Sequence, residues 1–420
     1  MIIRLGVENF ASINERQTLN MEPASYSEKK DSNLFVWNNE HEKLQLLNTA
    51  AIYGPNAGGK SNFLAALATM RRFVGRSAQW QAGDKLTYKP FKLSSKTANA
   101  PTEFEVEFIK DKVRYLYGFT YNAERILSEW LFAYPKKKAQ KWFLRAWDGE
   151  NYQWDLGRSL TGEKQTWLNS TRPNSLFLST AVQLNSAQLK PAFDWFTSEV
   201  AIAGVDGWSN DFTSRQCDDE EEKPKIIALM KEVDILVDDI IVEKEEFDAD
   251  KLPEDMPSDL KSKILEKLSG ETLFEPKFVR KRDDGELVTF ELSEESDGTN
   301  RFFAFAGPWL DALKNGRVLF VDELNSNLHP LLVKHMVDLF HCKKSNPKNA
   351  QLIFTTHETS ILNQSVFRRD QIWFMQKNNT NSSDLYSLVD FNVRKGVDNL
   401  EERYLSGSYG ATPFISWSDC

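Results

Sequence analysis

Apolar and polar positions alternate with two different periods along the chain, and the period predicts the elements. Short apolar runs at residues 2–7, near Leu19 and at 46–53 predict buried β-strands. The polar stretch 22–43 predicts a surface loop. Large apolar side chains recur at helical spacing over 60–73, so a helix is expected directly after the third strand.

A period of two begins at Glu103 and continues through four runs. These lie at residues 104–108, 115–119, 130–134 and 142–147. Such alternation is typical of strands with one buried face, so the runs predict an antiparallel meander. Residues 175–180 predict one further strand.

The region 187–269 has a largely helical and strongly charged pattern. Helices are expected at 225–237 and 258–268, with a short strand at 240–242 between them. This region interrupts the order of elements on either side, so it is interpreted as an insertion.

The part that follows begins with a hairpin and then alternates between helix and strand. The hairpin spans 278–292 and turns at Asp283-Asp284-Gly285. The succession is helix 300–313, strand 318–321, helix 331–340 and strand 352–355. That order is typical of an α/β fold with a parallel sheet.

Together the patterns predict an α/β fold with a mixed sheet, an antiparallel β meander and a helical insertion. The expected parts are an N-terminal lobe at 1–186, an insertion at 187–270 that forms an arm or a lid, and a C-terminal lobe at 271–420. A chain of 420 residues that is 41% apolar is long enough to bury the core of such a fold.

Charge and composition narrow the function classes. The formal net charge is −9, whereas a chain that coats nucleic acid by charge alone is basic; a local basic groove stays open. The first apolar run is too short for a signal peptide, and no apolar run reaches about 18 residues, so no membrane contact is expected. Cys217, Cys342 and Cys420 are far apart, which indicates a reducing cytoplasm and offers no metal spacing.

A glycine-rich turn between the third strand and the first helix carries the strongest chemical signal. It comprises Gly54, Pro55, Asn56, Ala57, Gly58, Gly59, Lys60 and Ser61, followed by Asn62. The turn fits the phosphate-loop pattern G-x-x-x-x-G-K-[ST], in which backbone N–H groups cradle phosphate oxygens. Lys60 is expected to reach the β- and γ-phosphates of ATP, and the Ser61 hydroxyl is expected to bind Mg²⁺.

Two carboxylates, Asp322 and Glu323, directly follow the apolar strand 318–321. Open α/β sheets bind ligands at the carboxyl ends of their strands. Asp322 is therefore assigned to the Mg²⁺ shell, and Glu323 is assigned as the general base that activates the attacking water. The alternative is a strand that ends in two solvated acids, and the phosphate loop argues against it.

Two weaker candidates flank these acids in the sequence. His357 follows the apolar strand 352–355 and is expected to hydrogen-bond a γ-phosphate, although a lone histidine after a strand is usually structural. Ser296 precedes the helix 300–313. It is either a helix cap alone or, with Gly298, an anion site for a nucleotide on a neighbouring subunit.

In this order and spacing, the four stretches resemble the ABC ATPase superfamily, within it the branch of chromosome-maintenance, Rad-fifty-like and OLD-like ATPases. Asn9-Phe10 after the first strand, Asn56 inside the loop and the large insertion favour that branch. More narrowly, the chain is similar to the bacterial AAA family ATPases that include RloA and AbiLi. The segments behind this likeness are Ile52-Tyr53-Gly54, Leu176-Phe177-Leu178-Ser179 with Gln183, Glu295-Ser296-Asp297-Gly298-Thr299 and the tail 404–411.

The resemblance implies roles for residues outside the phosphate loop. The ABC signature falls on 295–298, where Ser296 and Gly298 match the family pattern and the two acidic residues do not. The glutamine of the Q-loop, a Mg²⁺ ligand, maps to Gln183 because that residue follows an expected strand and precedes the insertion. The D-loop maps to Ser326-Asn327-Leu328-His329.

The resemblance also implies cofactors and partners. They are ATP and Mg²⁺, a head-to-tail homodimer with two ATP molecules at its interface, and an effector protein, often a nuclease, encoded alongside. Three functions stay open. The first is a regulatory ATPase whose dimer state controls an effector in anti-phage defence. The others are a DNA-repair or DNA-tethering ATPase, and a nucleotide-bound scaffold with little turnover.

The length of the chain after His357 and two charged runs bear on the choice among these functions. About 60 residues follow His357, too few for the Toprim nuclease domain of OLD proteins. The run Lys136-Lys137-Lys138 is either a nucleic-acid patch or a solvated hairpin tip. The acidic run 218–222 is either a docking surface or a solvated loop. Any contact with nucleic acid is expected to be indirect.

Overall fold

The computed structural model describes residues 1–247, 256, 261, 265 and 272–413. The chain forms two compact units. The first comprises Met1–Val205, Ala312–Ser326 and Val333–Cys420, and the second comprises Asp206–Asp311 and Asn327–Leu332. Each unit contains at least one β-sheet of its own.

These boundaries differ from the lobes expected from the sequence. Residues 187–205 were assigned to the insertion 187–270, but they belong to the first unit. The reason is that β11 (Val200–Ala203) pairs in parallel with β15 (Val318–Val321). Residues 271–311 were assigned to the C-terminal lobe, but they belong to the second unit.

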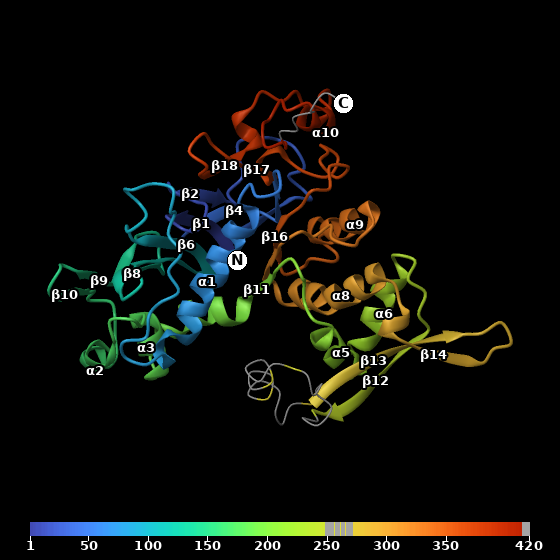
Figure 1. Cartoon of the computed structure of the whole chain (residues 1–420), viewed down its shortest axis with the longest axis horizontal. Helices are drawn as coiled ribbons and strands as arrows, with labels where there is room; N and C mark the ends of the chain where they lie inside the picture. The colour runs from blue at the N-terminus through green and yellow to red at the C-terminus, as the bar shows by residue number, and fades with distance from the viewer. Residues whose placement is uncertain (248–255, 257–260, 262–264, 266–271, 414–420) are drawn as a thin grey trace. The chain divides into compact units, whose positions relative to one another are not determined.

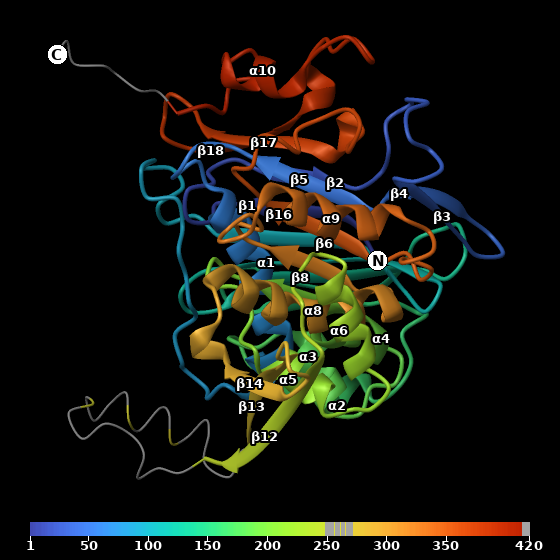
Figure 2. The same cartoon turned by 90° about the vertical axis from the view of Figure 1, so that its right-hand side faces the viewer.

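A six-stranded mixed sheet organises the first unit. Its order is β11-β15-β16-β5-β17-β18, with β16 at Gln351–Thr355, β5 at Thr49–Tyr53, β17 at Ile372–Lys377 and β18 at Ser383–Ser387. The first five strands are parallel, and only β18 runs antiparallel to its neighbour. Figure 2 shows β5 and β17 side by side. Because β15, β16 and β5 are consecutive in this order, their carboxyl ends meet at one edge of the sheet.

The first unit also contains a seven-stranded antiparallel sheet, which confirms the expected meander. Its order is β10-β9-β8-β7-β6-β1-β2. The strands are β1 (Ile2–Glu8), β2 (Gln17–Asn20), β6 (Thr102–Lys110), β7 (Val113–Tyr121), β8 (Ile126–Tyr134), β9 (Gln140–Trp147) and β10 (Tyr152–Leu156). In Figure 1 most of these strands are teal.

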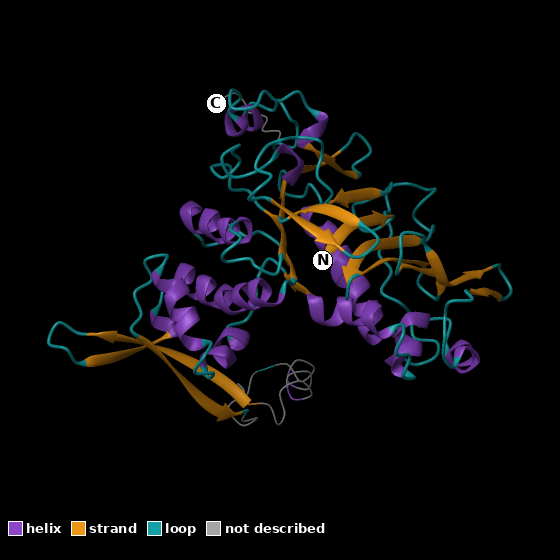
Figure 3. Ribbon diagram, turned by 180° about the vertical axis from the view of Figure 1, so that it is seen from behind, coloured by secondary structure: helices purple, strands orange, loops and turns teal. Residues whose placement is uncertain are grey.

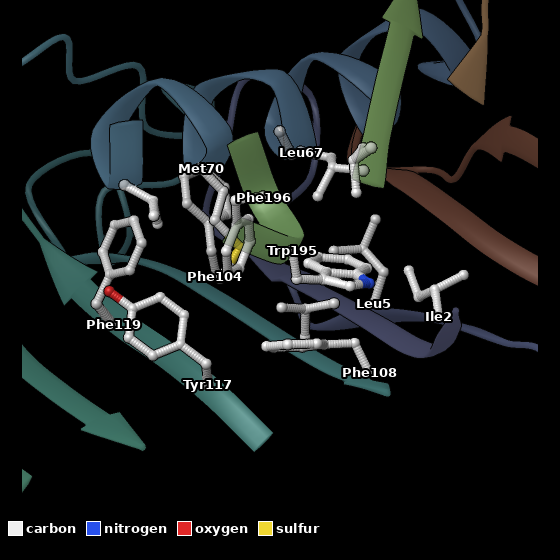
Figure 4. Packing of buried hydrophobic residues seen from close by; sticks show 14 of the residues in the cluster. Ile2, Leu5, Leu67, Met70, Phe104, Phe108, Tyr117, Phe119, Trp195 and Phe196 are labelled. Carbon is white, nitrogen blue, oxygen red and sulfur yellow. The ribbon is translucent and has the colours of Figure 1, made fainter. Parts of the chain in front are cut away.

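The core of the first unit lies between this sheet and the helix α1 (Lys60–Arg76). Figure 4 shows Leu67 and Met70 of α1 above the aromatic side chains of β6 and β7. Trp195 of the π-helix η2 (Trp195–Glu199) stacks on Phe108, with ring centroids 4.3 Å apart. Each large apolar side chain buried here stabilises the fold by roughly 1.5–3 kcal/mol. The core therefore holds the start of α1 rigidly beside the six-stranded sheet.

Two sequence expectations near the N-terminus are wrong. The stretch 22–43 is not only a loop, because β3 (Leu34–Asn38) pairs with β4 (Lys43–Leu47). The run 46–53 is not one strand, because β4 and β5 belong to different sheets. The break falls at Asn48, whose backbone N–H donates to the Asn33 carbonyl at 3.0 Å. Both halves are apolar, so the hydrophobic pattern gave no sign of the break.

The strand expected at 175–180 is also wrong, since Phe177–Gln183 form the helix α3. The backbone N–H groups of Phe177 and Leu178 donate to the Glu129 carboxylate at 2.7 and 3.0 Å. Glu129 thus satisfies the free amides at the start of α3, a role that a local capping residue usually fills. Because Glu129 lies on β8, far away in sequence, the local pattern resembled a strand.

The second unit contains a three-stranded antiparallel sheet, visible in Figure 3 as its orange arrows. The strands are β12 (Asp239–Glu246), β13 (Thr272–Lys281) and β14 (Leu287–Glu291). The helices are α5 (Asp211–Cys217), α6 (Lys223–Lys231) and the start of α8 (Asp297–Asn315). The expected strand at 240–242 and the hairpin turning at Gly285 are confirmed. The helix expected at 225–237 ends at Lys231, and the one expected at 258–268 lies outside the described residues.

The remaining elements are short, apart from the 12-residue helix α9. They are α2 (Lys164–Ser170), α4 (Lys190–Asp194), α9 (Pro330–His341), α10 (Leu400–Leu405) and the 3₁₀ turns at Ser77–Gln79, Leu292–Glu294, Arg369–Gln371 and Leu388–Asp390. Within the described part of the chain, no helix has the length and apolarity needed to cross a bilayer. Cys217 and Cys342 are free thiols.

Candidate functional site

The turn between β5 and α1 wraps around the side chain of Lys60. The Lys60 ammonium donates to the Gly54 carbonyl at 2.7 Å and to the Pro55 carbonyl at 3.1 Å. Burial lowers the pKa of Lys60 to about 8, and the carboxylates of Glu323 and Asp322 oppose that shift. A buried cation held at a glycine-rich turn and facing two acids is suited to binding a phosphate chain.

Glycine is required at three positions of this turn, and the first is Gly54, where a Cβ would lie 2.0 Å from the Met375 carbonyl oxygen. Gly59 has a φ of 111°, and a Cβ there would overlap the hydroxyl of Ser383. A Cβ on Gly58 would lie 2.7 Å from the Met375 carbonyl oxygen. The loop backbone therefore packs directly against β17 and β18, which leaves its N–H groups room for a ligand on the other side.

The two acids after β15 are fixed by Thr355, the last residue of the neighbouring strand β16. Its hydroxyl donates to the Asp322 carboxylate at 2.5 Å and accepts the backbone N–H of Glu323 at 2.8 Å. Glu323 adopts a φ of 50°, which is unusual for a residue with a side chain. Its carboxylate accepts the Ser326 hydroxyl at 3.3 Å. The turn is thus held in a strained conformation of the kind that clusters at functional sites.

Asn325 ties the loop that carries His357 to the turn after β15. Its side-chain oxygen accepts the Thr356 hydroxyl at 3.0 Å and the backbone N–H of His357 at 3.1 Å. The pKa of His357 is lowered, mainly by partial burial and then by the Lys60 charge, while Glu323 and Asp322 act in the opposite direction. Its imidazole is therefore neutral at pH 7.

The parallel strand order brings the phosphate loop after β5, the acids after β15 and His357 after β16 to one edge of the six-stranded sheet. Ser61 and Asp322 line the same cavity, whose volume is about 830 Å³. A second cavity of about 620 Å³ is lined by the turn 54–58 and by His357. The phosphate-loop turn therefore borders both cavities, since Ser61 lines one together with Asp322 and residues 54–58 line the other together with His357.

The sequence model described as "AAA domain, putative AbiEii toxin, Type IV TA system" matches residues 50–363. The match covers more than half of the chain and includes the turn, both acids and His357. The chain belongs to this family. The broad resemblance to ABC-type AAA family ATPases is therefore confirmed, and the α/β fold class with its mixed sheet and antiparallel meander agrees with it.

This AAA-domain chain is also similar to several solved structures. A chromosome-maintenance protein head bound to the C-terminal winged-helix domain of ScpA is 14% identical, with 92% of this chain and 97% of that chain covered and a TM-score of 0.40. The SMC head domain from Thermotoga maritima is 12% identical, with 93% and 99% covered and a TM-score of 0.40. The recombination mediator RecF with ATP is 15% identical, with 84% and 93% covered and a TM-score of 0.28. No curated protein matches.

The signature candidates of this AAA-domain chain lie in the second unit, at the start of α8. The Ser296 hydroxyl accepts the Thr299 backbone N–H at 3.1 Å, so Ser296 caps the helix as expected. A Cβ on Gly298 would lie 2.9 Å from the Asn327 carbonyl oxygen, which brings the D-loop backbone against the signature. Glu295, which departs from the family pattern, forms an ion pair with Arg280.

The structure places Gln183 at the end of a helix and Asn62 in contact with the segment after β1. Gln183 is the exposed last residue of α3, and it is not among the described residues that line the cavity with Ser61 and Asp322. Its expected position after a strand was wrong because α3 is a helix. The Asn62 amide donates to the Ser12 hydroxyl at 2.8 Å, so it tethers the segment after β1 to α1.

Two residues that hold the candidate site in place were not singled out from the sequence. Thr355 was interpreted only as the end of an apolar strand, and Asn325 only as a loop residue. A signal existed for Thr355, because a hydroxyl at the carboxyl end of a buried strand needs a hydrogen-bond partner. No sequence signal was available for Asn325, whose partners come from the loop after another strand.

Proposed function

We propose that this chain binds ATP with Mg²⁺ and hydrolyses it, and that nucleotide-dependent dimerisation regulates an effector partner. The observation that carries the proposal is the convergence at one sheet edge of a phosphate-type loop with a buried lysine, a strained carboxylate turn and a neutral histidine. These are the groups that positioning and electrostatic stabilisation of a phosphoryl transfer need.

The residues present fit both cofactors. The start of α1 offers backbone N–H groups and a favourable dipole for the β- and γ-phosphates, and Lys60 exchanges its two carbonyl partners for phosphate oxygens. Ser61 and the buried Asp322 carboxylate, which face one cavity, would hold Mg²⁺. The metal supplies polarisation of the phosphoryl oxygens and neutralises charge that develops in the transition state.

Glu323 orients the attacking water and accepts its proton. Its backbone is fixed by Thr355 and its carboxylate by Ser326, so little reorganisation is needed during the reaction. The neutral His357 imidazole donates a hydrogen bond to the γ-phosphate.

The dimer part of the proposal rests on the start of α8. Ser296 and Gly298 lie at an exposed helix N-terminus in the second unit, which suits binding to the γ-phosphate held by another copy. Two copies related by a two-fold axis then enclose two nucleotides, and hydrolysis removes the contacts that join them. Regulation of an effector is supported by the family description, which names a toxin–antitoxin system.

The test is a Glu323→Gln variant of the full chain. The variant is expected to bind ATP like the unmodified protein and to hydrolyse it at least about 100-fold more slowly, because loss of the general base removes a factor of about 10²–10⁴. It also accumulates as an ATP-dependent dimer, measured by light scattering after gel filtration. Glu358→Gln is the matched control, because within the described part of the chain that carboxylate accepts just the Ser360 backbone N–H.

Unchanged hydrolysis by Glu323→Gln would remove Glu323 from its role as base. An unmodified chain that neither binds nor hydrolyses Mg-ATP would end the proposal as a whole. Effector regulation has a separate readout, in which the product of the neighbouring reading frame co-purifies with the chain in one nucleotide state and is released in the other.

A further inference from the structure

One face of α1 lines a groove that extends away from the phosphate loop. The residues of that face are Ser61, Leu64, Ala65, Ala68, Arg71, Arg72, Gly75 and Arg76. They repeat at helical spacing, so the cavity of about 830 Å³ follows the helix along its length. Thr197, Ile202, Ala203 and Gly204 form the opposite wall. The part lined by Arg71, Arg72 and Arg76 is called the arginine groove below.

The arginine groove carries uncompensated positive charge. Among the described residues, none of its three arginines forms an ion pair with a carboxylate, whereas Arg4, Arg16, Arg114, Arg280, Arg369 and Arg403 each do. Burial alone lowers the pKa of Arg71, and no acid counteracts it. In a chain with a net charge of −9, three unpaired arginines on one wall of a cavity indicate an anionic ligand.

The ATP site does not supply that anion. The helical rise of about 1.5 Å per residue puts Arg72 about 16 Å and Arg76 about 22 Å beyond Ser61 along α1. Phosphates bound at the start of the helix leave both guanidinium groups unsatisfied. Arg71 is held in position by its own Nε–H, which donates to the Phe196 carbonyl at 3.0 Å.

We propose that the arginine groove binds the phosphodiester backbone of a single-stranded nucleic acid. Guanidinium groups bind phosphate through paired hydrogen bonds, and cations at successive turns of a rigid helix fit a ligand that carries a charge on every repeat unit. A nucleic-acid strand does so whatever its sequence, whereas a polypeptide does so only where acidic residues cluster. The arginines would contact phosphates, which carry no sequence information, so binding is expected to be independent of sequence.

The test measures binding of a fluorescein-labelled oligothymidylate to the full chain by anisotropy, without nucleotide, over a series of salt concentrations. The variant is Arg72→Ala/Arg76→Ala, which removes two exposed side chains and leaves Arg71 on its carbonyl. Affinity is expected to fall about tenfold or more, and the slope of log K against log salt to decrease by about 1.4, since each single-strand phosphate contact contributes about 0.7.

The control is Lys136→Ala/Lys137→Ala/Lys138→Ala, which removes more charge from the exposed tip of the β8–β9 hairpin. It is expected to bind like the unmodified chain. Loss of binding in this control with retention in the arginine variant would overturn the proposal in favour of the hairpin tip. Equal binding in all three proteins, or none in the unmodified chain, would also overturn it.

Competition with unlabelled polyanions distinguishes a nucleic-acid strand from other anionic ligands. An oligoadenylate RNA is expected to compete like the DNA, and polyglutamate or tripolyphosphate only far more weakly. Polyglutamate that competes as well as the strand would overturn the assignment to phosphodiester. ATP binding by the arginine variant, measured in parallel, is expected to be unchanged. The groove and the proposed ATPase site can therefore fail independently.

Discussion

A buried cation and a buried carboxylate lie at each of the two large sheets of the first unit, and the two pairs differ in whether they border a cavity. Glu129 and Arg145 lie within the seven-stranded sheet, are fully buried and are 3.1 Å apart. Lys60 and Asp322 lie at the edge of the six-stranded sheet and are 5% and 4% exposed. The turn that holds Lys60 and the side chain of Asp322 both border cavities.

The partners of each pair explain the difference. Glu129 also accepts the Tyr117 hydroxyl at 3.0 Å and the two amides that begin α3, so its oxygens are used by the protein itself. Among the described residues, the partners of the Lys60 ammonium are two loop carbonyls, which a ligand can replace. Charges whose partners all belong to the fold stabilise it, whereas charges with exchangeable partners beside a cavity are available for function.

The largest effect is expected from breaking the structural pair. Glu129→Leu leaves the Arg145 guanidinium buried without its carboxylate and removes the cap of α3. The expected loss is about 3–5 kcal/mol in the free energy of unfolding, measured by denaturant titration.

The double variant Glu129→Leu/Arg145→Met should recover much of that loss, because replacing both members of a buried pair by apolar groups is often near neutral. If Glu129→Leu were as stable as the unmodified chain, the pair would not stabilise the fold, and the proposed difference between the two pairs would be wrong.

Removing the cation beside the cavities should have the opposite pattern. Lys60→Ala is expected to weaken ATP binding by about 2–5 kcal/mol, the usual effect of deleting one partner of a desolvated charge contact, and to leave the unfolding midpoint nearly unchanged. Calorimetry measures the first quantity and denaturant titration the second. Lys136→Ala is the matched control, since this exposed lysine at the tip of the β8–β9 hairpin lines neither cavity. Unchanged ATP binding by Lys60→Ala would contradict the role of Lys60 in binding phosphate.

The candidate site at the edge of the six-stranded sheet could be predicted from the sequence better than the buried pair of Glu129 and Arg145. The phosphate loop is contiguous in sequence, and its glycines and Lys60 are recognisable without tertiary information. Asp322 and His357 were recognisable because each follows an apolar strand and the carboxyl ends of parallel strands meet at one edge. The α/β class and the meander followed from periods that each element carries within itself.

The rest depended on contacts between distant residues. Helix α3 resembled a strand because the Glu129 that caps it lies 48 residues before Phe177. The premise of the Gln183 assignment, a preceding strand, failed with it. The boundary at 187 was wrong because pairing between β11 and β15 joins segments more than 100 residues apart. Thr355 acquires its role only when β16 becomes the neighbour of β15.

Thr355 offers a sharper probe of the functional edge, because it contacts the acids without being exposed. Thr355→Val keeps the shape of the side chain but removes both hydrogen bonds to the turn of Asp322 and Glu323. Hydrolysis is expected to fall about 10- to 100-fold, as is usual when a partner that orients a metal ligand is lost. The Mg²⁺ concentration for half-maximal rate should rise, and Thr355→Ser should restore both values. Equal rates for the valine and serine variants would show that the hydroxyl does not position the acids.

The smallest effect concerns the protonation of Lys60. Its pKa of about 8 without ligand lies below the usual 10.5, so the ammonium is present below pH 8 and is lost above it. A triphosphate binds the ammonium form, and binding at pH 9 therefore requires uptake of a proton. Affinity should fall about tenfold from pH 7 to pH 9, or about 1.4 kcal/mol. Calorimetry in buffers of different ionisation enthalpy should give uptake near one proton at pH 9 and near zero at pH 7. Lys60→Arg keeps its charge across this pH range and should therefore abolish the proton uptake. If the unmodified chain took up the same number of protons at pH 7 and pH 9, the lowered pKa of Lys60 would be contradicted.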